Sequence, residues 1–153
     1  MKGGECLKMI SSQDYLPIGY DAADEDIHYA LEENEDTYTL VFRFDDVKLQ
    51  MDNLSADVLL QPMRTFAKDN GIQEVKTGIF QSAGKDAFAL LTMIVPKICY
   101  GNIQILKYLS KWKMYNRYEI SDAKTASISW FMNQEPQSMA ELGLCETESG
   151  GVC

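Results

Sequence analysis

The hydrophobic residues of this chain follow two different periods, and the change from one to the other occurs twice. Between residues 36 and 132, a segment with a two-residue period leads to one with a 3.6-residue period and then back again. A period of two is typical of β-strands, and a period of 3.6 is typical of α-helices. The pattern therefore predicts strand, helix and strand, followed by the same three elements once more.

The first repeat starts with residues 37–44, where β-branched and aromatic residues alternate as in a strand. Residues 55–70 are predicted to be a helix, because Ser55 is a favourable N-cap and Gly71 follows the end. Pro62 lies within this helix. Since an interior proline bends or ends a helix, the chain either bends at Pro62 or starts its regular helix there.

Residues 75–81 are predicted to be the strand that ends the first repeat. The second repeat follows them. Residues 87–95 are almost continuously apolar, which favours a central strand, although so short an apolar run is also compatible with a helix. Residues 102–117 carry apolar side chains at helical spacing, and residues 125–132 are predicted to be the last strand.

Two strand–helix–strand units joined by a hairpin predict an α+β fold of the ferredoxin-like βαββαβ type. Its antiparallel sheet would carry both helices on one face. Weaker alternation at 27–33 and 47–52 predicts additional strands near the N-terminus. We expect three parts, which are an N-terminal arm (1–25), a single α+β domain (26–133) and an acidic C-terminal tail (134–153). This fold hosts many functions and assigns none by itself.

The net charge of −9 is distributed unevenly. Residues 1–60 contain 4 Lys or Arg and 14 Asp or Glu, residues 61–132 contain 10 and 5, and residues 133–153 contain none and 4. Such a charge disfavours nucleic acid and anionic membranes as partners and favours basic proteins. The leading hypothesis is a non-enzymatic acidic binding protein, an inhibitor or immunity-type partner that neutralises a basic protein such as a toxin or nuclease.

The candidate partner-binding residues are acidic side chains of the N-terminal third, together with two tyrosines as aromatic anchors. Exposed charges mainly speed association, whereas buried aromatic side chains slow dissociation. The candidates are Asp24, Glu25, Asp26, Tyr29, Glu32, Glu33, Tyr38, Asp45 and Asp46.

A second hypothesis is a ferredoxin-like domain that binds nucleotide or nucleic acid through basic and aromatic residues between 107 and 118. Its contact residues would be Lys107, Lys111, Lys113 and Arg117. The same segment has a structural interpretation, in which Trp112 and some tyrosines belong to the core. In that interpretation, the lysines pair with the protein's own acidic segments.

A third hypothesis is a metal-dependent nucleotide enzyme that uses Asp45, Asp46 and Asp52, which follow the first predicted strand. The predicted central hairpin offers only Asp86 as a further ligand, so we expect no catalytic residue, no metal and no cofactor. The four cysteines lack metal-ligand spacing, and no secretory signal is expected at the N-terminus. These features predict free thiols and a cytoplasmic location.

Overall fold

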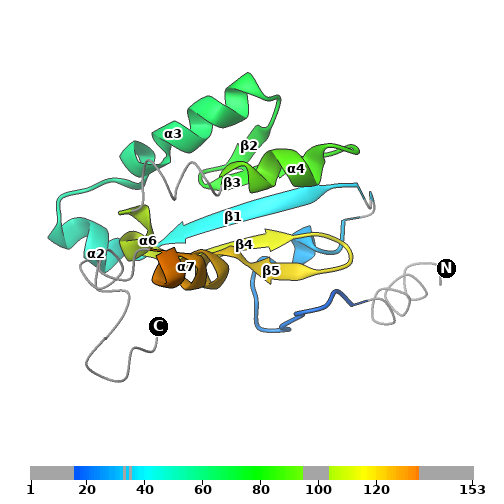
Figure 1. The fold of residues 1–153 in the computed structure, drawn as a ribbon, viewed down its shortest axis with the longest axis horizontal. Coiled ribbons are helices and arrows are strands. Elements are labelled where there is room, and N and C mark those ends of the chain that lie inside the picture. The colour runs from blue at the N-terminus through cyan, green and yellow to red at the C-terminus, as the bar shows by residue number, and fades with distance from the viewer. Residues whose placement is uncertain (1–15, 33, 35, 95–103, 135–153) are drawn as a thin grey trace.

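The computed structural model describes residues 16–32, 34, 36–94 and 104–134 (Figure 1). Over these residues the chain has an α+β fold with a five-stranded antiparallel sheet, in the order β2-β3-β1-β4-β5. Its elements are the 3-10 turn η1 (Ile27–Tyr29), β1 (Tyr38–Phe44), α2 (Asp46–Met51), α3 (Ala56–Asp69), β2 (Gln73–Lys76), β3 (Ile79–Ser82), α4 (Ala87–Thr92), α6 (Ile105–Tyr108), β4 (Leu109–Tyr115), β5 (Ile120–Asp122) and α7 (Ala123–Gln134).

Strand β1 lies at the centre of the sheet, where the predicted strand at 37–44 is confirmed. It pairs with β3 on one side, with Leu40 opposite Phe80, and with β4 on the other, with Phe42 opposite Trp112. Residues from Leu40 through Phe42 are buried, as expected for a strand covered on both faces.

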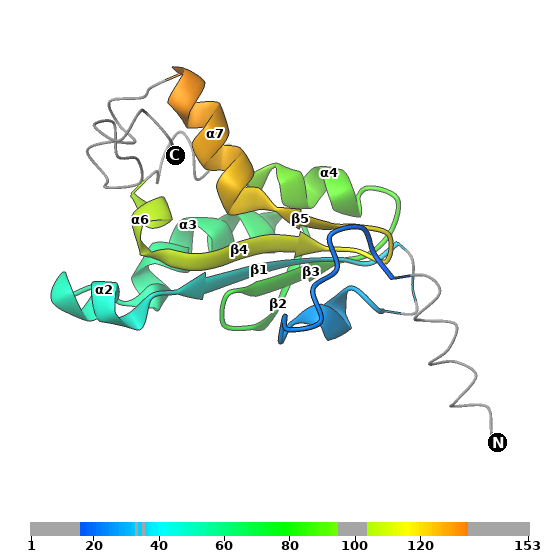
Figure 2. The same cartoon turned by 90° about the horizontal axis from the view of Figure 1, so that it is seen from below.

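The two faces of the sheet carry different layers (Figure 2). Helices α3, α4 and α7 cover one face, which we call the helix face, and residues 16–31 cover the other, which we call the N-terminal face. Because successive side chains of a strand point to opposite faces, β1 supplies both layers. Leu40 and Phe42 belong to the core of the helix face, and Val41 belongs to the core of the N-terminal face.

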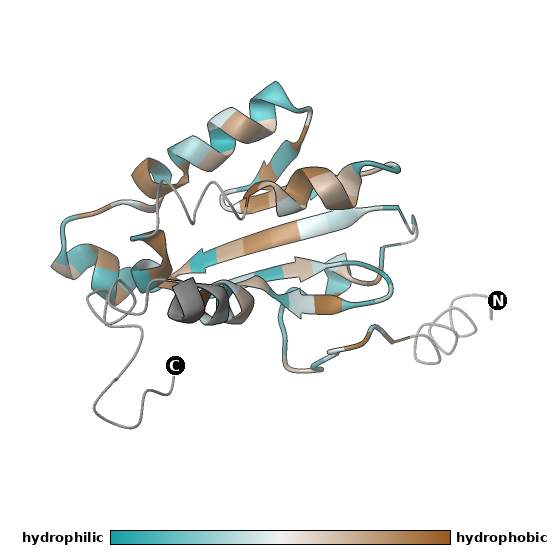
Figure 3. Cartoon of the chain, in the orientation of Figure 1, coloured by the Kyte–Doolittle hydropathy of each residue, from teal (hydrophilic) through white to brown (hydrophobic). Residues whose placement is uncertain are grey.

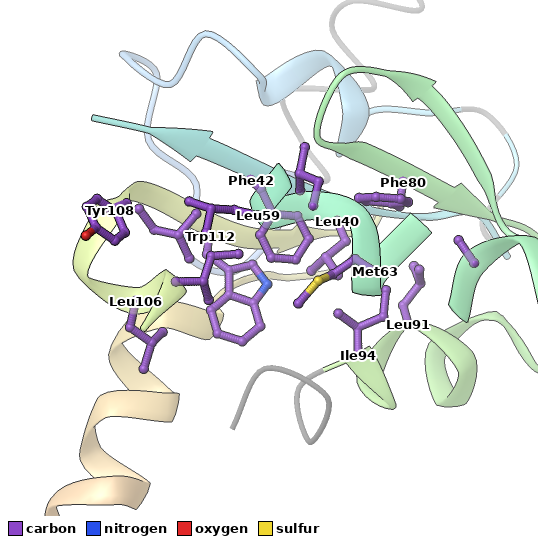
Figure 4. Close-up of a cluster of buried hydrophobic side chains, with 14 of the residues drawn as sticks. Leu40, Phe42, Leu59, Met63, Phe80, Leu91, Ile94, Leu106, Tyr108 and Trp112 are labelled. Atoms are coloured by element: carbon purple, nitrogen blue, oxygen red, sulfur yellow. The ribbon is translucent and has the colours of Figure 1, made fainter. Parts of the chain in front are cut away.

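The larger core lies on the helix face (Figure 4). Trp112 of β4 stacks on Phe42 at 5.5 Å between ring centroids, and Phe80 meets Phe42 edge to face at 5.9 Å. Met63 of α3 and Leu91 of α4 close this core on the side away from the sheet. Figure 3 shows apolar residues along the middle of β1 and mixed polar and apolar residues along α3, as expected for a helix with one buried side.

The predicted helix at 55–70 is confirmed as α3. The Ser55 hydroxyl accepts a hydrogen bond from the Val58 N–H at 3.2 Å, so Ser55 is its N-cap. Gly71 follows the helix with φ +70°, which suits glycine. The helix is continuous through Pro62, so it does not start at this residue.

The prediction of a single strand at 75–81 is wrong, because the chain turns within this range to form the β2–β3 hairpin. Gly78 lies in the turn with φ +78°, and a Cβ placed on it would lie 2.7 Å from the Phe42 carbonyl oxygen. Positive φ and close approach to another strand both require glycine, and this is why the chain can turn here.

Three predictions for the second half of the chain are wrong in the part that the structure describes. Residues 87–92 form helix α4 instead of a strand, residues 125–132 lie within helix α7, and the predicted helix at 102–117 contains α6 and then strand β4. In α4 the buried residues Ala87 and Leu91 are four apart, which is helical spacing. Residues 95 and 102–103 lie outside the described residues.

The prediction of two additional strands near the N-terminus, at 27–33 and 47–52, is also wrong. Residues 27–29 form η1, and 46–51 form α2. The Asp45 carboxylate accepts hydrogen bonds from the N–H groups of Val47 and Lys48, which starts a helix where the alternation had predicted a strand. The α+β class and the antiparallel sheet are therefore confirmed, whereas the exact ferredoxin-like topology is not confirmed.

Candidate functional site

A buried ionic cluster joins residues 16–31 to the N-terminal face of the sheet. Asp24 and Asp26 have side chains that are only 2% exposed, and they flank the ammonium group of Lys111 from β4. The Lys111 Nζ lies 2.7 Å from Asp24 Oδ1 and 2.8 Å from Asp26 Oδ2. One cation therefore holds two carboxylates of the N-terminal segment against the sheet.

Further donors complete the cluster. Arg43 of β1 binds Asp26 through two hydrogen bonds, from Nη2 to Oδ1 at 2.6 Å and from Nε to Oδ2 at 3.0 Å. This is the planar two-point geometry that suits a guanidinium and a carboxylate. The Tyr115 hydroxyl donates to Asp24 Oδ2 at 2.6 Å. Each buried carboxylate thus has several donors, as burial of charge requires.

The cluster remains ionised at neutral pH. Burial alone would raise the pKa of Asp24, but hydrogen bonds from Lys111 and Tyr115 outweigh it and lower that pKa to about 2. Burial would likewise raise the pKa of Asp26, but the donors Arg43 and Lys111 lower it. Burial and the bond to Asp24 raise the pKa of the Tyr115 hydroxyl, so it stays protonated as a donor.

The predicted partner-binding residues near the N-terminus have different surroundings. Asp24 and Asp26 are internal, whereas Glu25 is 70% exposed and lies 3.3 Å from Arg43. Tyr29 is half-buried, packs on the core of the N-terminal face, and has its ring 4.1 Å from that of His28. Glu32 is half-buried, and Glu33 lies outside the described residues.

The remaining three predicted residues lie at opposite ends of β1. Tyr38 begins the strand, and Asp45 and Asp46 directly follow its other end. A strand rises about 3.3 Å per residue, so roughly 20 Å separates them. Asp45 caps α2, and Asp46 is exposed in its first turn. The described residues of the predicted set therefore do not form one continuous surface.

The basic segment at 107–118 is largely neutralised by the protein's own acids. Lys107 lies 3.5 Å from Asp52, and both Lys111 and Lys113 pair with Asp24. Trp112 is fully buried. The structural interpretation of this segment is thus confirmed for its three lysines and its tryptophan. Arg117, the fourth predicted residue, is exposed in the turn after β4.

Two of the three aspartates of the metal hypothesis, Asp45 and Asp52, have structural roles. Asp52 accepts a hydrogen bond from the Tyr108 hydroxyl at 2.6 Å, and this bond, together with Lys107, lowers the pKa of Asp52. Asp45 is used as the cap of α2. Across the described ranges, no three or more His, Cys, Asp or Glu side chains gather as a metal site would require.

A small pocket of about 210 Å³ opens at the end of the sheet where β1 begins. We call it the aromatic pocket, and its lining residues are Tyr38, Phe88, Met114, Asn116, Tyr118, Glu119 and Ser121. The rings of Tyr38 and Phe88 are 5.5 Å apart and tilted by 58°. Phe88 is 53% exposed and Tyr118 is 56% exposed, so both present aromatic surface to solvent.

Sequence reasoning identified Tyr38 as an aromatic anchor but missed the rest of this pocket. Phe88 had been assigned to a strand, although it belongs to α4. Tyr118 and Glu119 follow the predicted helix at 102–117, and in the structure they lie in the turn between β4 and β5. The available signal was Asn116, whose carboxamide oxygen accepts the Tyr118 N–H at 2.8 Å as in a typical Asx turn.

Comparisons with protein-family models, with curated proteins and with solved structures found no match to this chain. Its function is therefore argued from its own residues. Among the residues that the structure describes, no helix has both the length and the apolar character needed to cross a membrane.

Proposed function

We propose that this chain is a non-enzymatic acidic binding protein that neutralises a basic protein, as an inhibitor or an immunity-type partner does. The observation that supports this proposal is the balance of paired and unpaired charge. Basic residues that form salt bridges within the described part include Arg43, Arg64, Lys107, Lys111 and Lys113.

Many carboxylates are left without such a partner. The acidic residues that form no salt bridge in the described ranges are Asp21, Glu32, Asp36, Asp45, Asp46, Asp69, Asp86, Glu119 and Asp122. These nine carboxylates outnumber the six other basic residues of the described ranges, so the net charge outside the salt bridges is negative. The field of this charge attracts a basic protein and repels nucleic acid.

The proposed contact surface lies around the aromatic pocket. Asp36 and Asp86 are exposed, and each precedes by two residues an aromatic side chain of the pocket, Tyr38 and Phe88 respectively. Aromatic anchors often dominate protein–protein binding, and charged residues at the rim of a contact surface speed association. Lys85 is also exposed near Asp86, so the surface has mixed charge with an acidic excess.

We further propose that β1, α3, β2, β3, α4 and β4 form a ferredoxin-like βαββαβ unit, to which β5 and α7 are added. The order β2-β3-β1-β4, with antiparallel neighbours and with α3 and α4 on one face, supports this assignment. An experimental structure with a different strand order would refute it. The cytoplasmic location stays a prediction, which fractionation of the source cells would test.

The function is tested by capture from a lysate of the source cells, treated with nuclease, with the tagged chain as bait. The test variant is Asp36→Asn/Asp86→Asn, and the matched control is Asp46→Asn/Asp69→Asn, which removes the same charge elsewhere. We expect a basic protein to be retained by the native chain and the control, and retained less by the test variant. Recovery of nucleic acid from an untreated lysate, or of only acidic proteins, would contradict the proposal.

A further inference from the structure

We propose that the aromatic pocket binds one lysine or arginine side chain of the basic partner. This inference rests on the proposed function and adds to it the chemical group that is recognised and the residues that recognise it. It is carried by the shape of the pocket, by its aromatic walls and by its single charged residue.

The aromatic walls come from three separate elements. Tyr38 lies at the start of β1, Phe88 in the first turn of α4, and Tyr118 in the turn between β4 and β5. A cation within about 6 Å of an aromatic ring is attracted by the negative face of that ring. Phe88 and Tyr118 are 53% and 56% exposed, so parts of both side chains contact solvent beside the pocket.

Glu119 gives the aromatic pocket a negative charge. It is the charged residue among the lining side chains, and its carboxylate forms no salt bridge within the described part of the chain. A carboxylate beside aromatic rings is suited to an ammonium or a guanidinium group, which it can bind by charge-assisted hydrogen bonds. The same carboxylate would repel a phosphate group.

Polar neighbours of Glu119 suit the same ligand. The side chain of Ser121 offers a hydroxyl oxygen that can accept a hydrogen bond, and Ser121 lies in β5 opposite Met114 of β4. Asn116 holds the turn through its bond to the Tyr118 N–H, which fixes the position of Tyr118 beside the pocket. An anchor that is held in place in this way loses little conformational entropy on binding.

The size of the pocket limits its occupant. Its volume of about 210 Å³ is below the range of roughly 300–1,000 Å³ that is usual for drug-sized ligands and cofactors. A nucleotide does not fit such a space, whereas the end of one long side chain does. A protein that inserts a single basic side chain would gain an anchor at the centre of the contact surface.

The inference is tested by NMR titration of the full chain with three short peptides of identical length. Two are acetyl-Gly-Arg-Gly-amide and acetyl-Gly-Lys-Gly-amide, and the third carries citrulline, which has the shape of arginine without its charge. We expect both basic peptides to shift the resonances of Tyr38, Phe88 and Tyr118, with millimolar affinity as the order of magnitude. The citrulline peptide is expected to bind at least fivefold more weakly.

Two variants and a control locate the binding. Glu119→Gln and Phe88→Ala are each expected to lower the affinity for the arginine peptide at least fivefold. Asp69→Asn on α3 is expected to leave this affinity unchanged. Both test residues are exposed, and unchanged circular dichroism would verify that the variants fold. Equal binding of the citrulline peptide, or unchanged affinity in both test variants, would overturn the inference.

The two proposals can fail separately. If the captured basic protein binds Glu119→Gln and Phe88→Ala as tightly as the native chain, the pocket is not its anchor, and only the further inference fails. If the arginine peptide binds at the pocket but no basic protein is captured, the cation site stands and the proposed function fails.

Discussion

Lys111 bonds to two buried carboxylates, and this arrangement decides what the acidic N-terminal segment can do. Asp24 and Asp26 looked like surface charges in the sequence, because they stand in an acidic run with no basic residue nearby. Their partner Lys111 is 87 and 85 residues away along the chain. Sequence can predict the charge of such residues, but it cannot show that a distant strand returns to neutralise them.

The first prediction concerns removal of this cation. Lys111→Met keeps the length of the side chain but leaves Asp24 and Asp26 with fewer partners in a buried site. Breaking a buried ion pair from one side costs about 3–5 kcal/mol, and because Arg43 and Tyr115 remain, we expect about 3 kcal/mol. Urea denaturation measures this loss, with exposed Lys68→Met as the control. A loss below about 0.5 kcal/mol, typical of surface pairs, would contradict the description of the cluster.

The second prediction is a dependence of stability on acidity. The pKa of Asp24 is about 2 in the folded protein and 3.8 in the absence of these interactions. Because the pKa of Asp24 is lower in the folded than in the unfolded protein, ionised Asp24 stabilises the fold at any pH above about 4. This contribution is lost as the pH falls from about 4 to about 2. It amounts to at most about 2 kcal/mol.

Urea denaturation at pH 5, 4, 3 and 2 measures this loss. We expect Asp24→Asn to lose less unfolding free energy than the native chain across this range. A part of the loss persists in the variant, because the pKa of Asp26 is also lowered. Identical pH dependence for the two proteins would show that Asp24 does not titrate as described.

At the scale of elements, β1 and α3 could be predicted, whereas η1, α2, the β2–β3 hairpin and the elements after it could not. Residues 37–44 and α3 carry clear periods, and α3 has a cap that can be read from Ser55. In β4, by contrast, Lys111 and Lys113 face the ionic cluster while Trp112 faces the opposite core. This period of two was masked by large side chains that also fit a helix, and tertiary packing decided between them.

The third prediction tests the β2–β3 turn. Gly78→Ala would combine positive φ with a Cβ 2.7 Å from the Phe42 carbonyl oxygen, whereas Gly71, at φ +70°, has no atom within 4 Å of its Cβ position. Strain at positive φ costs about 1–2 kcal/mol, and crowding adds to it. We expect thermal or urea denaturation to show a loss of about 1 kcal/mol for Gly71→Ala and roughly 3 kcal/mol for Gly78→Ala. Equal losses of unfolding free energy in the two variants would mean that contact with the Phe42 carbonyl oxygen does not add to the cost of Gly78→Ala.

The fourth prediction concerns the proline inside α3. Pro62 offers no N–H to the carbonyl of Val58 one turn earlier, and an interior proline costs a helix about 3 kcal/mol. Pro62→Ala restores that hydrogen bond, although it also increases the entropy of the unfolded chain. We therefore expect a net gain of about 1–2 kcal/mol in unfolding free energy, measured by urea denaturation. A loss of stability would mean that the proline ring contributes packing that outweighs the missing bond.

At the scale of the whole molecule, the charge of the described residues is divided between internal salt bridges and carboxylates that form none. The sequence predicted the sign of the net charge, because the excess of Asp and Glu can be counted directly. It could not predict where those carboxylates lie, since the strongest acidic run contains the two buried aspartates. The aromatic pocket was equally hidden, because Tyr38, Phe88 and Glu119 come together only through the sheet and α4.

We propose that a basic protein is recruited by the unpaired carboxylates around the aromatic pocket. The most direct measurement is the association rate of the captured partner by stopped flow, at low and at high salt. For the native chain we predict an association rate that falls as salt rises, because screening weakens attraction between opposite charges. Compared with the native chain, Asp36→Asn/Asp86→Asn should associate more slowly and with a weaker salt dependence. The control Asp46→Asn/Asp69→Asn should show smaller changes in both quantities. An association rate that does not change with salt, or that rises with it, would contradict the account.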